Sequence, residues 1–519
     1  MTMSQSPESA RPPRKTGSFS PPNTLVAVIL AAGKGTRMRS RLVKVLHPFL
    51  GRAMVLHAVD ASFRAGAERV VTVVGHQADD VRSAIDKAFA GWNLGYALQS
   101  EQRGTGHAVM CAMEAVGEPT NVLVVYGDTP LLMPQTLSRM VAAHRASSAT
   151  MTIASFIASD PTGYGRIVRA DPGPEAKGAV LPGPPGRVSR IVEQADATAQ
   201  ESAIVEVNAG MCIIRADALA AALSRLEPHN AQGELYLTDV VADLATRGDK
   251  VESFLLADAI EASGVNTRSQ LATLEEIALQ RMRLRWMDRG VSMQDPSSIR
   301  IDAEVDIGED TLLGPNVQLL GKTRIGIGCR IDAGAIVDNC ELGDFVHIKP
   351  YSVVTGSRLA MRTEVGPFAH LRAGTELGEK AKIGNFVETK KAKIGSNSKA
   401  SHLSYLGDCE LGKDVNIGAG TITCNYDGFE KFKTIIGDGV FIGSDSQLVA
   451  PVEIGKNATI GAGTTVTRNV PEGALAVSRS DQRHIDDYYG KRRKPRELLR
   501  EKAKTEAKNE AKNEARKGS

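Results

Sequence analysis

The sequence lacks the features that mark several classes of protein. Its 519 residues carry 63 Lys and Arg against 60 Asp and Glu, so the formal net charge is only +3. A balance this even leaves no charge excess of the kind that binds nucleic acid or a membrane surface. The longest apolar run near the N-terminus, Leu25 to Ala32, is too short to span a bilayer. We therefore expect a cytoplasmic protein with neither a nucleic-acid partner nor a membrane partner.

Cysteine is scarce, and its spacing excludes two further classes. The six cysteines contain no C-x-x-C pair, which argues against a disulfide framework or a structural zinc site and is typical of a reducing cytosol. Residues 1–23 are rich in Ser, Pro and basic residues but have no apolar core, so we expect a disordered tail rather than a signal peptide. Aromatic residues make up only 4%, whereas the 50 glycines predict many repeated tight turns.

Strand patterns alternate with helical patterns over the first half of the chain. Continuous apolar runs at 25–30, 70–74 and 122–126 each lead into a turn that contains glycine, and helical stretches such as 51–65 and 104–116 lie between them. Buried strands that alternate with helices predict an α/β, Rossmann-like domain with a mostly parallel sheet.

Two segments after these strands have a different character. The Pro- and Gly-rich stretch 171–188 predicts an exposed loop. Further along, 267–289 carries Leu271, Leu274 and Met282 at helical spacing, which predicts a linking helix.

A six-residue repeat begins at Ile301. An aliphatic side chain recurs at every sixth position in three long runs, and glycine often follows it. The aliphatic positions are Ile301, Ile307, Leu313, Leu319, Ile325 and Ile331, then Val365, Leu371, Leu377 and Ile383, then Ile436, Ile442, Leu448, Ile454, Ile460 and Val466. The repeat predicts a left-handed parallel β-helix with three-sided coils of about 18 residues over 301–471. A β-sandwich with accidental spacing is the weaker alternative.

The repeat is interrupted twice. Its register shifts between 389 and 393, and residues 423–435 do not fit the period. Insertions in a solenoid emerge as loops and often form its binding face. We expect domains at 24–266 and 291–480, joined by a linking helix at 267–290. Residues 481–519, rich in Lys, Glu, Ala and Asn, would form a basic and polar tail that is disordered or partly helical.

A glycine-rich loop follows the first predicted strand. It reads L-A-A-G-K-G-T-R-M from Leu30 to Met38, and Lys44 follows shortly after. Its two glycines would let backbone N–H groups approach phosphate oxygens, and Arg37 and Lys44 would neutralise negative charge. The Gly-Lys-Ser/Thr ending of a Walker loop is missing. A bare Gly-x-Gly would be explained equally well by a simple turn.

Two more polar motifs follow predicted strands. The segment 99–108 contains Arg-Gly-Thr-Gly-His before a helix, which predicts a phosphate or base contact; a plain helix cap by Thr105 is the alternative. Asp128, in V-V-Y-G-D-T-P, lies at the carboxyl end of a buried strand, where ligands bind in open α/β sheets. A single carboxylate there suits Mg²⁺, which relies on substrate phosphates for other ligands. A helix N-cap at Asp128 is the alternative.

The motif L-A-A-G-x-G-T-x-M with a following lysine resembles the sugar-1-phosphate nucleotidylyltransferases. Joined to a long hexapeptide β-helix, it resembles one bacterial family over about 25–480: the bifunctional N-acetylglucosamine-1-phosphate uridylyltransferase/glucosamine-1-phosphate N-acetyltransferases. The resemblance implies that the chain acetylates glucosamine-1-phosphate with acetyl-CoA. It would then transfer UMP from UTP to N-acetylglucosamine-1-phosphate, releasing pyrophosphate. Mg²⁺, a homotrimer and a role in supplying peptidoglycan and lipopolysaccharide are implied as well.

The resemblance assigns residues to the uridylyl-transfer site. The residues expected to contact UTP or the UDP-sugar are Leu30, Ala31, Ala32, Gly33, Arg37 and Lys44, with Gln99, Gly104 and Thr105 at the uracil and ribose, Tyr126, Gly127 and Asp128 along the nucleotide, and Gly165, Glu193 and Asn208 at the sugar. Asp128 and Asn266 would be the Mg²⁺ ligands. No protein nucleophile is needed, because a phosphate oxygen of the sugar attacks the α-phosphorus, and the protein supplies positioning and charge neutralisation.

The resemblance also assigns an acetyl-transfer site on the β-helix. His402 would be the general base that takes a proton from the amine, a task suited to an imidazole because it titrates near neutral pH. The other residues expected there are Arg372 and Lys390 for the sugar phosphate, Tyr405 and Asn416 for the sugar, and Ala419, Asn425, Tyr426, Ser444, Ala462 and Arg479 for acetyl-CoA. Glu388 also matches a carboxylate of the site. Taken alone, His402 is better explained as an ordinary surface histidine.

Two departures from the family and three alternatives remain. The family usually has proline before the lysine, where this chain has Val43, so the loop would be freer; the stretch 171–188 is also longer than usual. One alternative is a single-activity nucleotidylyltransferase with a structural β-helix, and another is a scaffold that has lost catalysis. A zinc site of His347, His370 and His402 is disfavoured, because the three histidines do not share one position of the repeat.

Overall fold

The computed structural model describes residues 24–118, 120–170, 187–228, 230, 232–478 and 481–517. The predicted tail 1–23 and nearly all of the predicted loop 171–188 lie outside the described residues. The chain divides into two compact units, 1–373 and 374–519, and each is described by itself. Within the described part, no helix has the length and apolar character needed to cross a membrane.

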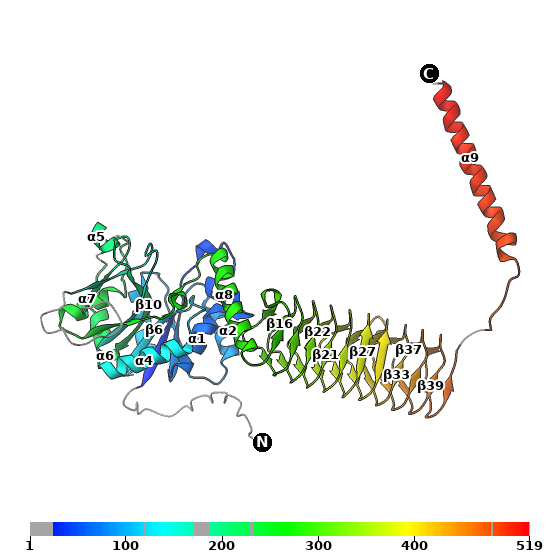
Figure 1. Cartoon of the computed structure of the whole chain (residues 1–519), viewed down its shortest axis with the longest axis horizontal. Helices are drawn as coiled ribbons and strands as arrows, with labels where there is room; N and C mark the ends of the chain where they lie inside the picture. The colour runs from blue at the N-terminus through cyan, green and yellow to red at the C-terminus, as the bar shows by residue number, and fades with distance from the viewer. Residues whose placement is uncertain are drawn as a thin grey trace. The chain divides into compact units, whose positions relative to one another are not determined.

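A nine-stranded sheet organises the N-terminal domain (Figure 1). Its main path runs β11-β7-β10-β6-β1-β4-β5, with β8 beside β10 and β9 beside β8. The strands are β1 (Leu25–Leu30), β4 (Arg69–Val74), β5 (Leu94–Leu98), β6 (Asn121–Tyr126), β7 (Met151–Ile157), β8 (Arg166–Arg169), β9 (Val188–Val192), β10 (Glu206–Arg215) and β11 (Val251–Leu255). Strands β6, β1, β4 and β5 are parallel, whereas β10 is antiparallel to both of its neighbours.

Helices cover both faces of this sheet. They are α1 (Met54–Arg64), α2 (Ala78–Ala88), α3 (Thr105–Val116), α4 (Pro134–Ser147), α5 (Ala199–Ser202), α6 (Ala216–Leu223) and α7 (Asp239–Thr246). Alternate side chains of β1 enter two separate cores: Ile29 packs with residues of α1, α2 and α4, and Val28 packs with residues of α3, α6 and α7. The continuous apolar run of β1 is therefore explained by burial on both faces, as predicted.

A third hydrophobic core joins the glycine-rich loop and the hairpin that follows it to α8 (Arg268–Met287). It gathers Met38 of the glycine-rich loop, Phe49 and Leu50 of the hairpin β2 (Pro48–Phe49)–β3 (Arg52–Ala53), and Leu274 of α8. The helix begins with a capping box in which the Thr267 hydroxyl accepts the Gln270 N–H. Arg268, in the first turn, donates to the Met38 carbonyl at 3.1 Å.

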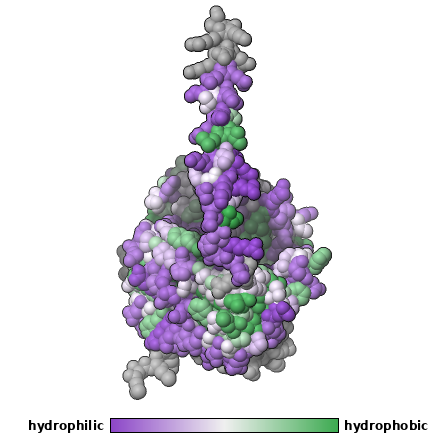
Figure 2. Space-filling view, turned by 90° about the vertical axis from the view of Figure 1, so that its right-hand side faces the viewer, coloured by the Kyte–Doolittle hydropathy of each residue, from purple (hydrophilic) through white to green (hydrophobic). Residues whose placement is uncertain are grey.

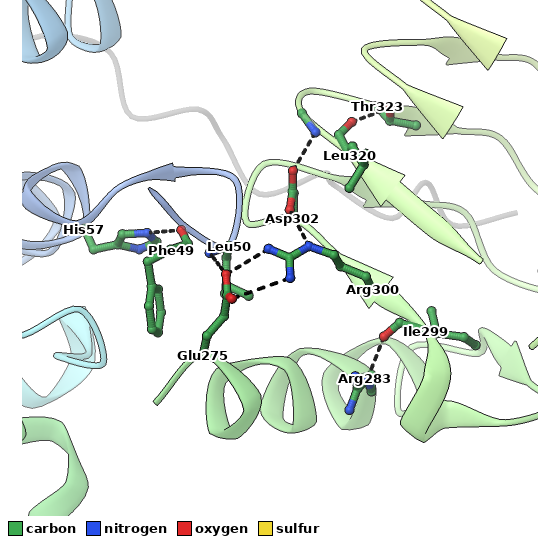
Figure 3. Close-up of polar contacts among 11 residues, drawn as sticks. Phe49, Leu50, His57, Glu275, Arg283, Ile299, Arg300, Asp302, Leu320 and Thr323 are labelled. Atoms are coloured by element: carbon green, nitrogen blue, oxygen red, sulfur yellow. Dashed lines mark hydrogen bonds and ion pairs between the residues drawn. The ribbon is translucent and has the colours of Figure 1, made fainter. Parts of the chain in front are cut away.

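Polar contacts fix the hairpin tip between α8 and the first coil of the β-helix (Figure 3). The Glu275 carboxylate accepts the Leu50 N–H at 2.9 Å and an Arg300 guanidinium N–H at 2.8 Å. The Leu50 carbonyl accepts the Ala303 N–H at 2.9 Å. The side chain of Asp302, next to Ala303, is buried against Gly51 and accepts the Gly321 N–H at 2.9 Å.

The β-helix begins in the first unit, where three parallel sheets wind around one core (Figure 1). The first sheet holds β12 (Ser292–Met293), β15 (Leu312–Leu313), β18 (Arg330–Ile331), β21 (His347–Ile348) and β24 (Glu364–Val365). The second holds β13 (Arg300–Ile301), β16 (Gln318–Leu320), β19 (Ile336–Asp338), β22 (Val353–Thr355) and β25 (His370–Leu371), and the third holds β14 (Asp306–Ile307), β17 (Arg324–Ile325), β20 (Glu341–Leu342) and β23 (Arg358–Leu359).

The second unit repeats the three-sheet arrangement within itself. Its first sheet holds β27 (Lys382–Asn385), β30 (Lys399–His402), β33 (Asn416–Ile417), β36 (Phe441–Ile442), β39 (Thr459–Ile460) and β41 (Leu475–Ala476). The second holds β28 (Glu388–Lys390), β31 (Tyr405–Gly407), β34 (Ile422–Cys424), β37 (Gln447–Val449) and β40 (Thr465–Val466), and the third holds β26 (Glu376–Leu377), β29 (Lys393–Ile394), β32 (Cys409–Leu411), β35 (Thr434–Ile436) and β38 (Val452–Ile454).

The repeated aliphatic residues are the buried core of the coils, which confirms the predicted hexapeptide β-helix. Coil length varies, however. Ile307 pairs with Ile325, eighteen residues on, whereas Ile325 pairs with Leu342, only seventeen on. One side of such a coil is a residue short, so a strict count in sixes loses the register between Ile331 and Val365.

The outward side chains of the third sheet alternate in charge. In the first unit they are Asp306, Arg324, Glu341 and Arg358. Arg358 contacts Glu341 at 3.2 Å. Because opposite charges face each other across neighbouring strands, this sheet satisfies its own charges on a solvated surface.

The chain continues after the coils into α9 (Lys494–Lys517), which follows a π-helical turn at Tyr489–Arg493. Figure 2 shows a largely hydrophilic surface with a green apolar patch on this projecting part of the chain, and the exposed large apolar residues of α9 are Leu498 and Leu499. Of the two states expected for the C-terminal tail, disordered or partly helical, the structure has the helical one for this stretch.

Candidate active sites

Four of the predicted nucleotide-site residues meet around one point. Lys44, in the 3₁₀ turn Lys44–Leu46, forms an ion pair with Asp128 and donates to Asn266 Oδ1 at 3.2 Å. Arg37 donates to the same Asn266 oxygen at 2.9 Å. The Lys44 and Asp128 side chains are only 13% and 17% exposed, so their charges interact with limited screening by water.

The same oxygens fit a metal ion. Asp128 and Asn266 both direct an oxygen at the Lys44 ammonium, so the site already favours a cation. Two oxygen ligands suit a hard cation that completes its coordination shell with phosphate and water. Among the residues that the structure describes, no three His, Cys, Asp or Glu side chains gather as a metal site, which gives no support to the three-histidine alternative.

The glycine-rich loop lies beside the other nucleotide motifs. The Gly127 N–H donates to the Leu30 carbonyl at 3.0 Å, which aligns the carboxyl ends of β1 and β6. Gln102 donates from Nε2 to the Ala32 carbonyl at 2.6 Å, and Gln99 donates from Nε2 to the Gly104 carbonyl at 3.1 Å. Gln102 was not among the predicted site residues, although it lies inside the polar motif at 99–108.

The predicted sugar contacts also come together. The Asn208 N–H donates to the Gly165 carbonyl at 2.8 Å. A Cβ on Gly165 would lie 3.3 Å from the Glu193 carboxylate, so the absent side chain leaves that carboxylate accessible. Burial raises the pKa of Glu193, and the Thr238 hydroxyl, which donates to it at 3.1 Å, opposes that rise. Thr238 was not predicted.

The Tyr126 ring closes one side of this region. It packs against Gly210, where a Cβ would lie 2.7 Å from the ring. Burial raises the pKa of the Tyr126 hydroxyl, with Glu193 and Asp128 adding to the shift, so the phenol stays neutral. Gly33, by contrast, has open space where a Cβ would lie, and the backbone of the glycine-rich loop is accessible there.

On the β-helix, one column of residues runs through successive coils of the second unit. Ala400, Ile417, Ile442 and Ile460 pair in register along the first sheet. The residues two positions further along each strand path therefore occupy the same corner of their coils; they are His402, Ala419, Ser444 and Ala462. Backbone hydrogen bonds from the residues that follow Ser444 and Ala462 connect these coils: Asp445 N–H donates to the Ala419 carbonyl at 2.7 Å, and Gly463 N–H donates to the Ser444 carbonyl at 2.8 Å. The side chains beyond His402 are small, which leaves this corner open.

Asn385 occupies the same corner one coil before His402. Its Oδ1 lies 2.6 Å from His402 Nδ1. An amide oxygen only accepts hydrogen bonds, so this contact suits the tautomer in which Nδ1 carries the proton and Nε2 carries the lone pair. The contact therefore favours the tautomer that a general base requires. Sequence reasoning missed Asn385, although the register of the repeat could have located it.

The inserted loop leaves the coils between Cys424 and Thr434, as its misfit to the repeat predicted. Asn425 donates from Nδ2 to Asp408 Oδ2 at 2.6 Å and so anchors the start of the loop. Tyr426 is 59% exposed, and its hydroxyl donates to the Gly428 carbonyl at 2.6 Å.

The other predicted acetyl-transfer residues are distributed as follows. Tyr405 pairs in register with Glu388 on the second sheet, and its ring lies over Gly407, opposite Lys390. Asn416 lies on β33 beside Lys399. Arg372 lies in the first unit, and Arg479 lies outside the described residues.

Comparisons with known proteins agree with both halves of this arrangement. Residues 27–236 match the family model of the MobA-like NTP transferase domain, 296–425 match the GMPPB C-terminal domain, and 433–468 match the bacterial transferase hexapeptide repeats. The bifunctional protein GlmU of Pelobacter propionicus is 50% identical over 88% of this chain and 96% of its own length. The chain belongs to the GlmU family. Its relatives in Trichlorobacter lovleyi and Sorangium cellulosum, also bifunctional GlmU proteins, are 49% and 46% identical over 88% and 90% of the chain. Membership in the GlmU family confirms the resemblance and the predicted bifunctional transferase.

Proposed function

We propose that this GlmU-family chain makes UDP-N-acetylglucosamine in two steps, at two separate sites. The observation that carries the proposal is the presence of two independent reactive clusters: Lys44 with Asp128 and Asn266, and His402 with Asn385. The two clusters lie in different compact units. We propose domain limits of 24–266 and 291–480 around them, consistent with the position of α8 between.

In the acetyl-transfer step, Nε2 of His402 would take a proton from the amine of glucosamine-1-phosphate. As that proton moves, the amine nitrogen attacks the thioester carbon of acetyl-CoA, the new N–C bond forms and the C–S bond breaks; the proton held by His402 would then pass to the leaving thiolate, so that CoA is released as the thiol. The small residues beyond His402 provide the open corner in which the acetyl donor would lie. On the neighbouring sheet, Lys390 would bind the sugar phosphate and Tyr405 would bind the sugar.

In the uridylyl-transfer step, a phosphate oxygen of N-acetylglucosamine-1-phosphate would attack the α-phosphorus of UTP, and pyrophosphate leaves. Asp128 and Asn266 would hold Mg²⁺, which neutralises charge on the triphosphate when bound. Lys44 and Arg37, released from those oxygens, would bind phosphate oxygens instead. Glu193 and Asn208 would orient the sugar.

A coupled assay tests the function. Purified chain supplied with glucosamine-1-phosphate, acetyl-CoA, UTP and Mg²⁺ is expected to form UDP-N-acetylglucosamine, with CoA thiol and pyrophosphate released in equal amounts. Omitting acetyl-CoA should prevent the product, and EDTA should stop pyrophosphate release but not thiol release. Pyrophosphate release without any thiol release in the complete mixture would instead identify a single-activity nucleotidylyltransferase.

We also infer a homotrimer. Aromatic side chains on the first-unit coils are exposed, including Tyr351 at 59% and Phe368 at 49%, whose rings stack 5.4 Å apart. Exposed apolar clusters of this kind mark interaction surfaces, whereas the charge-alternating third sheet suits contact with water. A three-fold closed ring is a common symmetry. Light scattering at micromolar concentration should give three times the chain mass of 55.3 kDa; a monomer mass would contradict the trimer.

The six free cysteines suit the reducing cytoplasm in which we place the protein.

A further inference from the structure

The residue before Lys44 is held by a side chain from another part of the chain. The Val43 N–H donates to Oε1 of Gln77 at 2.8 Å. The other end of the same amide, Nε2, donates to the Arg41 carbonyl at 2.8 Å. Only this orientation of the amide satisfies both partners, because an N–H needs an acceptor and a carbonyl needs a donor. Gln77 therefore ties two backbone positions of the loop that leads into Lys44.

Gln77 is itself held in an unusual backbone conformation. Its φ is +54°, in the left-handed region, at the N-cap of α2. For a residue other than glycine, this backbone conformation costs free energy. Residues persist in it where the surrounding structure holds them there. Two residues earlier, Gly75 packs so closely on the glycine-rich loop that a Cβ would lie 2.7 Å from the Ala32 carbonyl oxygen. The turn 75–77 thus touches both the glycine-rich loop and the lysine loop.

Val43 has a backbone that proline could also adopt. Its φ is −61°, within the range that a proline ring imposes, and the residue is buried, at 2% exposed. A proline at this position would restrict the loop covalently but would have no N–H to donate. In this chain the restriction comes from the hydrogen bond to Gln77 instead. The expectation that Val43 leaves the loop freer is therefore corrected: the loop is anchored, but by a side chain.

We propose that Gln77 is a positioning residue for uridylyl transfer, whose amide fixes residues 41–43 so that the Lys44 ammonium reaches the nucleotide phosphates. The proposal rests on the proposed function of this site. Gln77 makes no contact with the reacting groups; it acts through the backbone next to Lys44. A loop that is no longer tied would sample positions in which Lys44 is displaced, which lowers the rate of the chemical step.

The test compares variants at Gln77 with a compensating change at Val43. Gln77→Met keeps the length of the side chain and removes both hydrogen bonds; we expect kcat/KM for UTP to fall about tenfold. Gln77→Glu keeps an acceptor for the Val43 N–H and should fall clearly less. Adding V43P to the Gln77→Met chain should regain most of the loss, because proline restricts the loop without needing an acceptor. Acetyl transfer, measured in the same samples, should be the same in every variant.

The outcomes separate the proposal from its foundation. Wild-type protein without uridylyl transfer would sink the proposed function itself. With wild-type activity established, Gln77→Met at the wild-type kcat/KM, or Gln77→Glu losing as much as Gln77→Met, would overturn the positioning role. So would a double variant no better than Gln77→Met while V43P alone is active. If V43P alone is inactive, the comparison of Gln77→Glu with Gln77→Met decides.

Discussion

Replacing His402 by alanine is expected to lower acetyl transfer by about 10²–10⁴-fold and to leave uridylyl transfer at its original rate. Among the residues described at this corner of the coil column, the His402 imidazole is the group placed to accept the amine proton, at Nε2. His402 is exposed and is not among the buried core residues, so its loss should not disturb the coils. Thiol release from acetyl-CoA and pyrophosphate release from UTP, assayed separately on the same preparation, measure the two activities.

Two variants serve as controls for the His402 result. Asp128→Asn should give the opposite pattern, loss of uridylyl transfer with acetyl transfer retained. Asn385→Ala should lower acetyl transfer by less than His402→Ala. It removes the hydrogen-bond acceptor at Nδ1 that favours one tautomer of His402, but it keeps the imidazole that acts as the base. Equal loss of both activities in His402→Ala would contradict the two-site arrangement.

Replacing Gly51 by alanine is expected to destabilise the first unit by about 3 kcal/mol or more. Leu50 and Gly51 have φ values of +47° and +79°, as in a two-residue type I′ hairpin turn. Alanine at Gly51 would be strained in this conformation, and its Cβ would lie 2.1 Å from Oδ2 of Asp302. Asp302 is buried and holds the Gly321 N–H, so it has little freedom to move away. Scanning calorimetry should show the first unfolding transition about 5 °C lower or more.

Gly248 provides the matched control for Gly51. Its φ is +84°, but no atom lies within 4 Å of the position a Cβ would take. Gly248→Ala therefore adds the backbone strain without the clash, and its transition should shift by about 2 °C. If the two variants shift equally, the contact between the hairpin tip and Asp302 contributes nothing to stability. Uridylyl transfer should also fall in Gly51→Ala, because the hairpin follows directly after Lys44.

The sequence predicted the two architectures because each has its own period. The run 25–30 is apolar at every position because both faces of β1 are buried. In the β-helix, the aliphatic side chain at every sixth position fills the interior of the coils. The hairpin β2–β3 was missed: the predicted helix at 51–65 begins only at Met54. Hairpin turns of this type usually carry Asn-Gly, whereas this tip is Leu-Gly, and burial of Leu50 against α8 compensates for its strained φ.

The site was predictable only where residues lie in a local motif. The glycine-rich loop and Asp128 follow strands directly, so their convergence at one sheet edge could be anticipated. Gln77 belongs to no motif, and its role exists only because α2 begins beside the lysine loop. Asn385 is recognisable from coil register, but that register requires knowing that the coil from Asn385 to His402 spans seventeen residues rather than eighteen.

The column that starts at His402 has a length scale built into it. Neighbouring parallel strands lie about 4.8 Å apart, so the three steps from His402 to Ala462 cover about 14 Å along the axis of the coils. Positions along this corner are therefore spaced by one coil each. An elongated molecule bound along it would extend from His402 by a whole number of such spacings. Adding or deleting one coil between Ile417 and Ile460 would lengthen or shorten this row of corner positions by one strand spacing, about 4.8 Å. The contacts within the other coils would stay the same. In a solenoid, the number of coils thus sets the length of this corner along the axis, independently of the chemistry at His402.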